Sequence, residues 1–183
     1  MPRSASSSVA ESMTIATLGL GGNIGNPPAA MAQALSTLAL HDDCNLLAVS
    51  HLYSTPPWGK TDQADFFNCC AMIETTLAAV ALLDLCLDIE RDMKRVRLER
   101  WGPRTIDIDV LTFGDESIVT ERVEIPHPRM TERGFVLLPL ADIAPDIRVK
   151  GRDIVSWLSD ADTTGIKRAN EKREWWTLPF PEV

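Results

Sequence analysis

An α+β fold is predicted by the order of the elements along the chain. Patterns typical of strands and helices follow one another as β-α-β-β-α-β up to Phe113, which is the order of a ferredoxin-like core. A β-hairpin and C-terminal helices are expected after that core. The length of 183 residues fits one ordinary domain, and a hydrophobic content of 45% is enough to bury a sizeable core.

The charge balance limits the classes of partner. Lys and Arg number 18 against 26 Asp and Glu, which gives a formal net charge of -8. Because phosphate binding needs basic charge, this argues against a protein that binds nucleic acid or an anionic membrane over its whole surface. The sequence contains no run of 18 apolar residues, the length needed to span a bilayer. The N-terminus MPRSASSSVAES also lacks the apolar segment of a secretion signal. A cytoplasmic protein is therefore expected, with neither nucleic-acid nor membrane partners.

Four cysteines are present, and none has the spacing of a metal site. Cys69 and Cys70 are adjacent in a predicted strand, so their side chains point to opposite faces and are poorly placed to pair with each other. Buried, reduced thiols are expected for these two and for Cys44 and Cys86.

The first elements are a leader, a strand and a helix. Residues 1–13 are rich in Ser and Ala and are interpreted as a flexible leader. A strand begins at Thr14 and runs into a glycine-rich turn. Asn26 is expected to cap the following helix, and Pro27 to occupy its first position, where proline is well tolerated. Apolar residues then recur at helical spacing, namely Met31, Ala34, Leu35 and Leu38.

Two strands and a second helix come next. The stretches NLLAVSHLYST and DFFNCCAMIET have the composition of strands, and a connection rich in Pro and Gly separates them. A helix is predicted from about Ala78, with an apolar stripe of Ala79, Leu82, Leu83, Cys86, Ile89 and Met93. A basic loop follows, and TIDIDVLTF is predicted to be the last strand of the core.

The remainder of the chain is expected to hold a hairpin and helices. Residues 118–125 are interpreted as a small β-hairpin, and TERGFVLLPLADIAP as a helix that Pro145 ends. A single folded domain is expected over residues 14–160. No role is predicted for the C-terminal tail at 161–183.

Two phosphate-binding signatures are nearly matched but are rejected. In LGLGGNIG the third glycine comes one residue too late for the dinucleotide-binding fingerprint, so a glycine-rich turn from strand to helix is expected. STPPWGKT ends like a P-loop, but Ser54 replaces the first glycine of that motif. Pro56 and Pro57 also remove backbone N–H groups that would face a phosphate.

The strongest local pattern is the pair of acidic residues in TIDIDVLTF. With a period of two, Asp107 and Asp109 lie on one face of the strand, roughly 6.5–7 Å apart. One interpretation is a solvated strand face. Against it, Asp is disfavoured in strands, and two like charges on one face repel each other. A divalent cation would remove both objections, so Mg²⁺, or two Mg²⁺ ions bridged by phosphate oxygens, is the other interpretation.

A basic segment precedes the acidic strand. Residues 90–104 contain six Lys or Arg and three Asp or Glu, a local charge of +3. Such a run is ordinarily a solvated helix end. Because arginine binds phosphates in a bidentate manner and Mg²⁺ on the aspartates would face the same anion, a polyphosphate between the two groups is the alternative. This arrangement is typical of phosphoryl transfer, in which catalysis depends on positioning and charge neutralisation.

Four aromatic residues lie beside turns or element ends rather than in helical stripes, namely Trp58, Phe66, Trp101 and Phe135. Phe66 and Asn68 share a strand face, and they offer a stacking ring beside an amide that both donates and accepts hydrogen bonds. Together such residues could bind a flat heterocycle, although each ring taken singly is more often part of a core.

Five motifs combine these features in one order along the chain. They are LGLGGNIGNP, YSTPPWG, DFFNC, RVRLERWGPRTIDIDVL and IPHPRMTERGFVLLPL, and they cover about residues 16–145. They resemble the 6-hydroxymethyl-7,8-dihydropterin pyrophosphokinase (HPPK) family of folate biosynthesis. The resemblance implies a ferredoxin-like α+β catalytic domain over residues 14–160. It also implies transfer of the terminal pyrophosphate of ATP to the hydroxymethyl group of 6-hydroxymethyl-7,8-dihydropterin, with release of AMP.

The resemblance also implies roles for particular residues. Asp107 and Asp109 would bind two Mg²⁺ ions, while Arg95 and Arg104 would contact the phosphates and stabilise charge during transfer. The ATP site would be lined by Glu90, Arg97, Val110, Arg122, His127 and Arg133. The pterin site would be formed by Thr55, Pro57, Trp58, Phe66, Asn68, Trp101 and Phe135, and the rings of Phe66 and Phe135 would enclose the pterin.

Two other classes of function are open from the residues alone. A metal-dependent nucleotidyltransferase also pairs a Gly-rich turn with strand carboxylates, but there the two features are close in sequence, whereas Gly22 and Asp107 are 85 positions apart. A ferredoxin-like RNA-binding module is opposed by the acidic charge and by the absence of a Gly-Phe-type strand motif. A monomer that takes only small-molecule substrates is expected.

Overall fold

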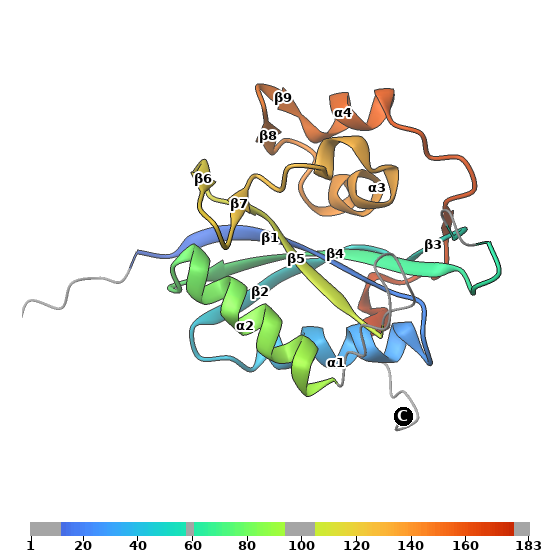
Figure 1. Cartoon of the computed structure of the whole chain (residues 1–183), viewed down its shortest axis with the longest axis horizontal. Coiled ribbons are helices and arrows are strands. Elements are labelled where there is room, and N and C mark those ends of the chain that lie inside the picture. The colour runs from blue at the N-terminus through green and yellow to red at the C-terminus, as the bar shows by residue number, and fades with distance from the viewer. Residues whose placement is uncertain (1–11, 58–60, 94–104, 178–183) are drawn as a thin grey trace, which may run out of the picture.

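A computed structural model of the chain describes residues 12–57, 61–93 and 105–177, and Figure 1 shows their arrangement. At the centre, this part of the chain forms a six-stranded sheet in the order β10-β3-β4-β1-β5, with β2 also paired to β4. Every pair is antiparallel. The strands are β1 (Thr14–Gly22), β2 (Cys44–Val49), β3 (Tyr53–Thr55), β4 (Phe66–Thr75), β5 (Asp107–Phe113) and β10 (Lys167–Arg168).

Helices cover both faces of this antiparallel sheet, which confirms the predicted combination of helices and strands in one fold (Figure 1). α1 (Pro27–Ala39) and α2 (Ala79–Asp92) lie on one side, which we call the α1/α2 face. α3 (Gly134–Ile143) lies on the opposite side, which we call the α3 face, and α4 (Ile154–Asp160) packs on α3. None of the helices within the described ranges is long and apolar enough to cross a membrane.

Each helical layer closes a hydrophobic core against the sheet. On the α1/α2 face, the fully buried side chains include Leu18, Met31, Leu35, Ile73 and Leu82. On the α3 face, a smaller core contains Cys70, Leu111, Met130, Leu137 and Leu140. Burial of an apolar side chain of this size contributes about 1.5–3 kcal/mol, so the two cores hold the sheet firmly between the helical layers.

All four cysteines are buried and free, as expected from the sequence. Cys69 belongs to the core on the α1/α2 face and Cys70 to the core on the α3 face, so the two adjacent thiols lie on opposite sides of β4. Burial raises the pKa of both thiols above the ordinary value, because a thiolate in an apolar core loses its solvation.

The first two helices confirm the sequence prediction. The Asn26 side chain accepts a hydrogen bond from the Ala29 backbone N–H at 3.2 Å, and Pro27 occupies the first helical position. α2 begins at Ala79, directly after the extended residue Ala78. Its buried positions are Ala79, Leu82, Cys86, Ile89 and Glu90, while Leu83 and Met93 are only partly buried.

One predicted strand is in fact two. The stretch from Asn45 to Thr55 divides into β2 and β3, and both strands pair with β4. Val49 lies opposite Ala71 and Tyr53 opposite Asn68, so four steps along one chain match three steps along the other. This extra residue is a bulge, and composition alone does not reveal it because the flanking residues keep a strand pattern.

The predicted helix over residues 131–144 also begins differently. A 3₁₀ helix, η1 (Met130–Glu132), comes first, and Arg133 then has an extended backbone. The Arg133 carbonyl accepts hydrogen bonds from the N–H groups of Val136 and Leu137, so α3 starts afresh at Gly134. The hairpin prediction is confirmed, because β6 (Ile118–Val119) pairs with β7 (Glu124–Ile125).

The C-terminal part of the chain returns to the sheet. A second hairpin, formed by β8 (Arg148–Val149) and β9 (Arg152–Asp153), leads into α4. The chain then runs from α4 to the outer edge of β3, where β10 joins the sheet (Figure 1). The 3₁₀ helix η2 (Arg173–Thr177) follows, and its Trp175 side chain is buried in the core on the α1/α2 face.

Candidate functional site

Two glycines of β1 lie between the acidic strand and Asn68 on the α3 face. Gly21 pairs with Asn68 on β4 and with Asp107 on β5, while Gly19 pairs with Cys70 and Asp109. Residues directly opposite in antiparallel strands point to the same face. A Cβ atom at Gly21 would lie 2.7 Å from the Asn68 side-chain oxygen, so a side chain there would displace the amide. The missing side chains therefore make room for neighbours. The Asn68 amide lies over Gly21, and the Leu111 side chain comes within 3.5 Å of where a Cβ atom at Gly19 would lie.

The acidic pair lies directly opposite these glycines. Asp107 and Asp109 share the α3 face of β5, as predicted from the period of two, and both are half-buried. The Asp109 side chain is 42% exposed, and its Oδ2 atom is 4.0 Å from Nε2 of His127. The carboxylates are thus held on a rigid strand and remain accessible to a ligand.

His127 lies beside the outer edge of β5. Its backbone N–H donates to the Leu111 carbonyl at 2.8 Å, and its side chain is 21% exposed. The His127 pKa is lowered, first because burial disfavours the charged ring and then because Arg133 and Arg129 are nearby. Burial outweighs the opposing attraction of Asp109, so the imidazole is neutral at neutral pH.

Glu90 supports the strand between the two aspartates. It lies on α2, is only 3% exposed, and accepts a hydrogen bond from the Ile108 N–H at 2.7 Å. Ile108 separates Asp107 from Asp109 in the chain. The buried carboxylate therefore fixes the backbone that carries the acidic pair.

The beginning of α3 contributes an arginine and an aromatic ring. Arg133 precedes the helix, and its guanidinium carbon lies 5.7 Å from the centre of the Phe135 ring. This distance is within the range of a cation–π contact. Phe135 is half-buried and packs against the core on the α3 face, so its ring is held in place on one side.

The beginning of α3, with Phe135, forms one wall beside the sheet, and the end of β3 together with the start of β4 forms a second wall. Thr55 pairs with Phe66, and the Asn68 Nδ2 atom donates to Thr55 Oγ1 at 3.3 Å. Thr55, Phe66 and Asn68 therefore share the α3 face with the acidic pair. The Asn68 side chain is nearly buried, with 9% exposure, which fixes the orientation of its amide.

Besides Glu90, which is buried on α2, two more of the predicted site residues have side chains directed away from the acidic pair. The Val110 side chain is 5% exposed and packs in the core on the α1/α2 face, so only its backbone is available on the other side. Arg122 lies in the turn between β6 and β7 and forms an ion pair with Asp84 of α2. Pro57 ends the first described range, and Trp58, Arg95, Arg97, Trp101 and Arg104 lie outside the described residues.

Some residues support the candidate site by positioning its loops and strands rather than by contacting a ligand, and these were not identified from the sequence. Asn23 donates from Nδ2 to Gln63 Oε1 at 3.0 Å and to the Ala64 carbonyl at 3.2 Å, so it ties the turn after β1 to the loop before β4. Gly19 and Gly21 fall within the predicted first strand, but no role in the site is predicted for them from the sequence. Their spacing of two inside a strand was the signal, because it places both on one face.

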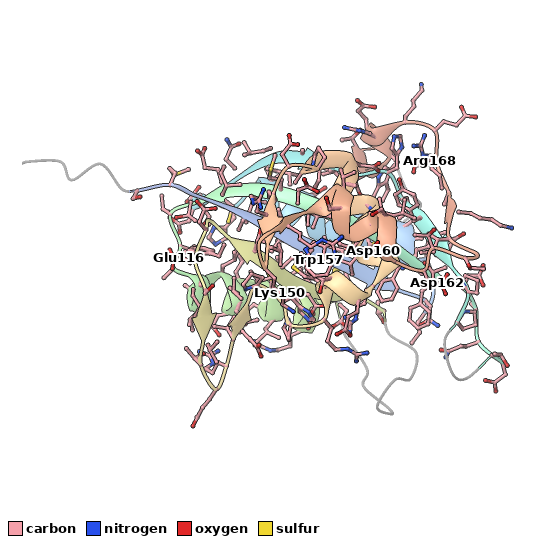
Figure 2. The ribbon with its side chains drawn as sticks, turned by 90° about the horizontal axis from the view of Figure 1, so that it is seen from above. Glu116, Lys150, Trp157, Asp160, Asp162 and Arg168 are labelled. Atoms are coloured by element: carbon pink, nitrogen blue, oxygen red, sulfur yellow. The ribbon has the colours of Figure 1, made fainter. Side chains whose placement is uncertain are left out.

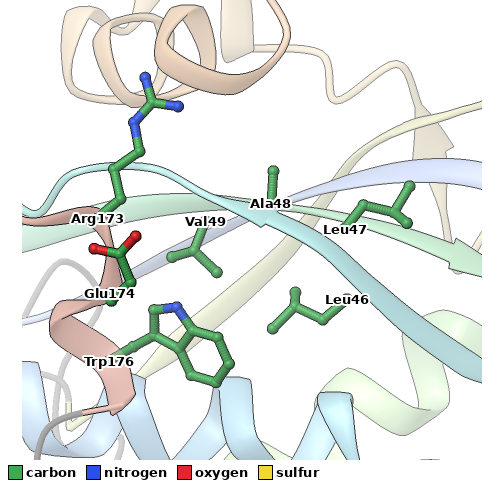
Figure 3. Close-up of a pocket in the computed structure, with 7 residues that line it drawn as sticks. All are labelled: Leu46, Leu47, Ala48, Val49, Arg173, Glu174 and Trp176. Atoms are coloured by element: carbon green, nitrogen blue, oxygen red, sulfur yellow. The ribbon is translucent and has the colours of Figure 1, made fainter.

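A pocket of about 240 Å³ lies away from these residues (Figure 3). It is lined by β2 and η2, through Leu46, Leu47, Ala48, Val49, Arg173, Glu174 and Trp176. β4 and β1 separate β2 from β5 in the sheet, so this pocket is not part of the acidic surface. No group of three or more His, Cys, Asp or Glu side chains suited to a metal ion occurs in the part of the chain that the structure describes.

The fold is that of a small α+β protein, in which two half-buried carboxylates share the α3 face of β5 opposite two glycines of β1. The family model of 7,8-dihydro-6-hydroxymethylpterin-pyrophosphokinase (HPPK) matches residues 17–145. The chain therefore belongs to the HPPK family.

Bacterial relatives support this assignment over most of the chain. A 2-amino-4-hydroxy-6-hydroxymethyldihydropteridine pyrophosphokinase of Methylorubrum extorquens is 47% identical over 85% of this chain and 99% of its own length. The enzyme of the same name from Pseudomonas aeruginosa is 42% identical over 81% of this chain and 93% of its own. The one from Bacillus subtilis is 40% identical over 86% and 92%.

Solved structures support the fold. HPPK-DHPS of Plasmodium falciparum, crystallised with pteroate, matches 81% of this chain with a TM-score of 0.65 and 18% sequence identity. The match spans 42% of that longer chain. At this identity the likeness concerns the fold alone.

Proposed function

We infer that this protein transfers pyrophosphate from ATP to 6-hydroxymethyl-7,8-dihydropterin in folate biosynthesis. The observation that carries the inference is family membership, since relatives at 40–47% identity over at least 80% of this chain bear the name of that enzyme. In the reaction, the pterin hydroxyl oxygen forms a bond to the β-phosphorus of ATP. The bond from that phosphorus to the oxygen bridging the α-phosphate breaks, AMP leaves with the bonding electrons, and the hydroxyl proton is released.

We propose that Asp107 and Asp109 hold Mg²⁺, with two ions as the expected number. The donor set fits, because Mg²⁺ is usually bound by one or two carboxylates together with substrate phosphates, and both carboxylates are only half-buried on the α3 face. When bound, Mg²⁺ neutralises the developing charge on the phosphates. Arg95 and Arg104 are proposed to contact the same phosphates.

The ATP site is proposed to extend from the acidic strand toward α3 and the β6–β7 hairpin. Neutral His127 can hydrogen-bond a ligand beside Asp109 without adding charge. Val110 is proposed to contribute backbone groups and Glu90 to act through the Ile108 N–H. The remaining residues proposed to line this site are Arg97, Arg122 and Arg133.

The pterin is proposed to bind between the wall at β3–β4 and the beginning of α3. Asn68 can recognise the edge of the ring, because its amide is oriented by Thr55. Phe66 and Phe135 are proposed to stack on the ring, and the backbone at Thr55 and Pro57 to meet its edge. Trp58 and Trp101 are proposed to complete the enclosure.

The detailed topology of the core and the extent of the catalytic domain are also proposed. The order β5-β1-β4, with β2 and β3 beyond, is consistent with a ferredoxin-like core. We propose that residues 14–160 form the catalytic domain of a cytoplasmic monomer that binds neither nucleic acid nor membranes.

The test is release of AMP from ATP with and without 6-hydroxymethyl-7,8-dihydropterin. Pterin-dependent AMP release in the presence of Mg²⁺ is expected, and it should stop when the metal is chelated. Tight, salt-sensitive binding of RNA without any pterin-dependent AMP release would contradict the proposal.

A further inference from the structure

The segment between α4 and the sheet touches both walls of the proposed pterin site. We call this segment, residues 161–170, the strap. It leaves α4, passes the beginning of α3 and ends along the outer edge of β3 (Figure 1). Asp162 and Arg168, which lie near its two ends, are labelled in Figure 2 on the side of the molecule where β3 lies.

The first contact is with α3. A Cβ atom at Gly134 would lie 2.2 Å from the Asp162 carbonyl oxygen, a distance that no side chain can occupy. Gly134 is buried and stands between Arg133 and Phe135. The strap therefore packs directly on the backbone that carries the Phe135 ring.

The second contact is with the end of β3. Gly165 has a φ of 78°, and a Cβ atom there would lie 2.9 Å from Cγ of Pro56. Pro56 stands between Thr55 and Pro57. The strap therefore also abuts the chain that forms the opposite wall.

Backbone pairing anchors the strap beside that wall. Lys167 pairs with Ser54 and Arg168 with Tyr53. Beyond this pair, the Ala169 N–H donates to the Leu52 carbonyl at 2.7 Å, and the Leu52 N–H donates to Asn170 Oδ1 at 2.6 Å. These bonds fix the strap to β3 and to the bulge before it.

A separate tie joins α3 to β3 at the other end of the helix. The Tyr53 hydroxyl donates to the Asp142 carboxylate at 2.9 Å, and the His51 N–H donates to the same group at 3.1 Å. The helix is therefore linked to β3 near its C-terminal end by Asp142 and at its N-terminal end by the strap.

We propose that the strap is a positioning element that sets the separation between Phe135 and the Thr55–Pro57 wall, and thereby the affinity for the pterin. The proposal rests on the proposed function, because it assigns these two walls to the pterin. The strap pairs with β3, and β4 and β1 separate β3 from the strand that carries Asp107 and Asp109, so ATP binding is not expected to depend on the strap.

The test is Gly165→Ala, with Gly151→Ala as the matched control. Both glycines are exposed and left-handed, with φ of 78° and 80°, but a Cβ atom at Gly151 has nothing within 4 Å. Both variants thus acquire similar backbone strain, but only the new methyl group of Gly165→Ala clashes with Pro56. Dissociation constants are measured for 6-hydroxymethyl-7,8-dihydropterin in the presence of α,β-methylene-ATP, and for that analogue alone, alongside thermal unfolding.

We expect Gly165→Ala to raise the pterin dissociation constant about three- to tenfold, as when an aromatic stacking contact is lost. The constant for the ATP analogue should change less than about twofold, and Gly151→Ala should change neither. Replacing Pro56 by Ala removes the ring atoms that the new methyl group would meet. In the Pro56→Ala background, Gly165→Ala should therefore have a much smaller effect on pterin affinity.

Three outcomes would overturn the proposal. Unchanged pterin affinity in folded Gly165→Ala would show that the strap does not determine the separation between Phe135 and the Thr55–Pro57 wall. Equal losses of pterin affinity in the Gly165 and Gly151 variants would assign the effect to general strain. Absence of pterin-dependent AMP release in the wild type would instead overturn the proposed function, and the strap proposal with it.

Discussion

At the scale of single residues, the surroundings of Asp107 and Asp109 are set by two uncharged glycines and by the buried Glu90. Two carboxylates on one strand face repel each other, and β1 places glycines directly opposite them. Glu90 holds the intervening Ile108 N–H from the side of α2. The pattern TIDID predicts the shared face of Asp107 and Asp109, but only the register shows which residues stand opposite, because cross-strand pairing is not encoded locally.

Replacing either aspartate by Ala should greatly reduce turnover. Loss of one electrostatic stabiliser typically costs about 2.7–4 kcal/mol in the transition state, which is roughly 10²–10³ in rate. The fold should survive, since removal of one of two like charges relieves repulsion. The measurement is kcat as a function of Mg²⁺ for Asp107→Ala and Asp109→Ala. Asp115→Ala is the control, because this carboxylate is exposed in the turn after β5. Wild-type rates in either site variant would favour the solvated-face interpretation.

Replacing Glu90 should mainly affect stability. Glu90→Ala leaves the Ile108 N–H without its carboxylate acceptor, and an unsatisfied buried donor costs about 1–3 kcal/mol. Glu90→Gln keeps a carbonyl oxygen in the same place and should lose less. Urea unfolding of both variants checks this. Equal stability of the two variants would show that the hydrogen bond to Ile108 contributes little.

At the scale of elements, those with strong local signals were predicted and those made by distant contacts were not. α1 has a capping Asn, a first-turn Pro and a continuous apolar stripe, so its position follows from the sequence. β10 has two exposed residues and exists because it meets the edge of β3. The bulge between β2 and β3 likewise depends on pairing with β4, which no local pattern reveals.

The C-terminal element η2 should be needed for stability. Trp175 is 3% exposed, packs in the core on the α1/α2 face, and donates from Nε1 to the Ser50 carbonyl at 3.0 Å. Trp175→Ala should therefore destabilise the fold by about 3–5 kcal/mol, as expected for removal of a buried Trp. Trp176→Ala is the neighbouring control, because that ring is only partly buried. Similar urea midpoints for the two variants would contradict the docking of η2.

At the scale of the whole molecule, the sheet separates two tasks. The α1/α2 face holds the larger hydrophobic core, whereas the α3 face combines a smaller core with the half-buried acidic pair. Both faces of the long strands are used, so one strand places Val110 in the core and leaves Asp109 partly exposed on the other side. This division follows from the period of two, which lets one strand contribute both to a hydrophobic core and to an accessible acidic face.

Stability of the whole fold should decrease as the pH falls below about 6.5, the ordinary value for His. Burial lowers the pKa of His51, and Arg168 and Arg173 lower it further against the opposing Asp142 and Glu174. Its Nδ1 atom has no hydrogen-bond partner among the described residues. The folded state therefore favours the neutral ring, and the unfolded state takes up the proton first. The resulting stability is present above pH 6.5 and is lost as the pH falls through the folded-state pKa.

Urea unfolding between pH 7.5 and 5.5 checks this expectation. His51→Gln should show a shallower loss of stability than the wild type, with His127 accounting for part of the remaining slope because its pKa is also lowered. Identical slopes for the two proteins would contradict the role of His51.

The four buried thiols also make the protein convenient for site-selective labelling. Burial raises the pKa of every one of them, to about 12 for Cys86, so reactive thiolate is scarce at neutral pH and the sulfur atoms are inaccessible. A single cysteine introduced at the exposed Lys167 should then react alone with a maleimide fluorophore. The native cysteines need not be removed, and the dye would report whether the strap stays paired with β3 during substrate binding and product release.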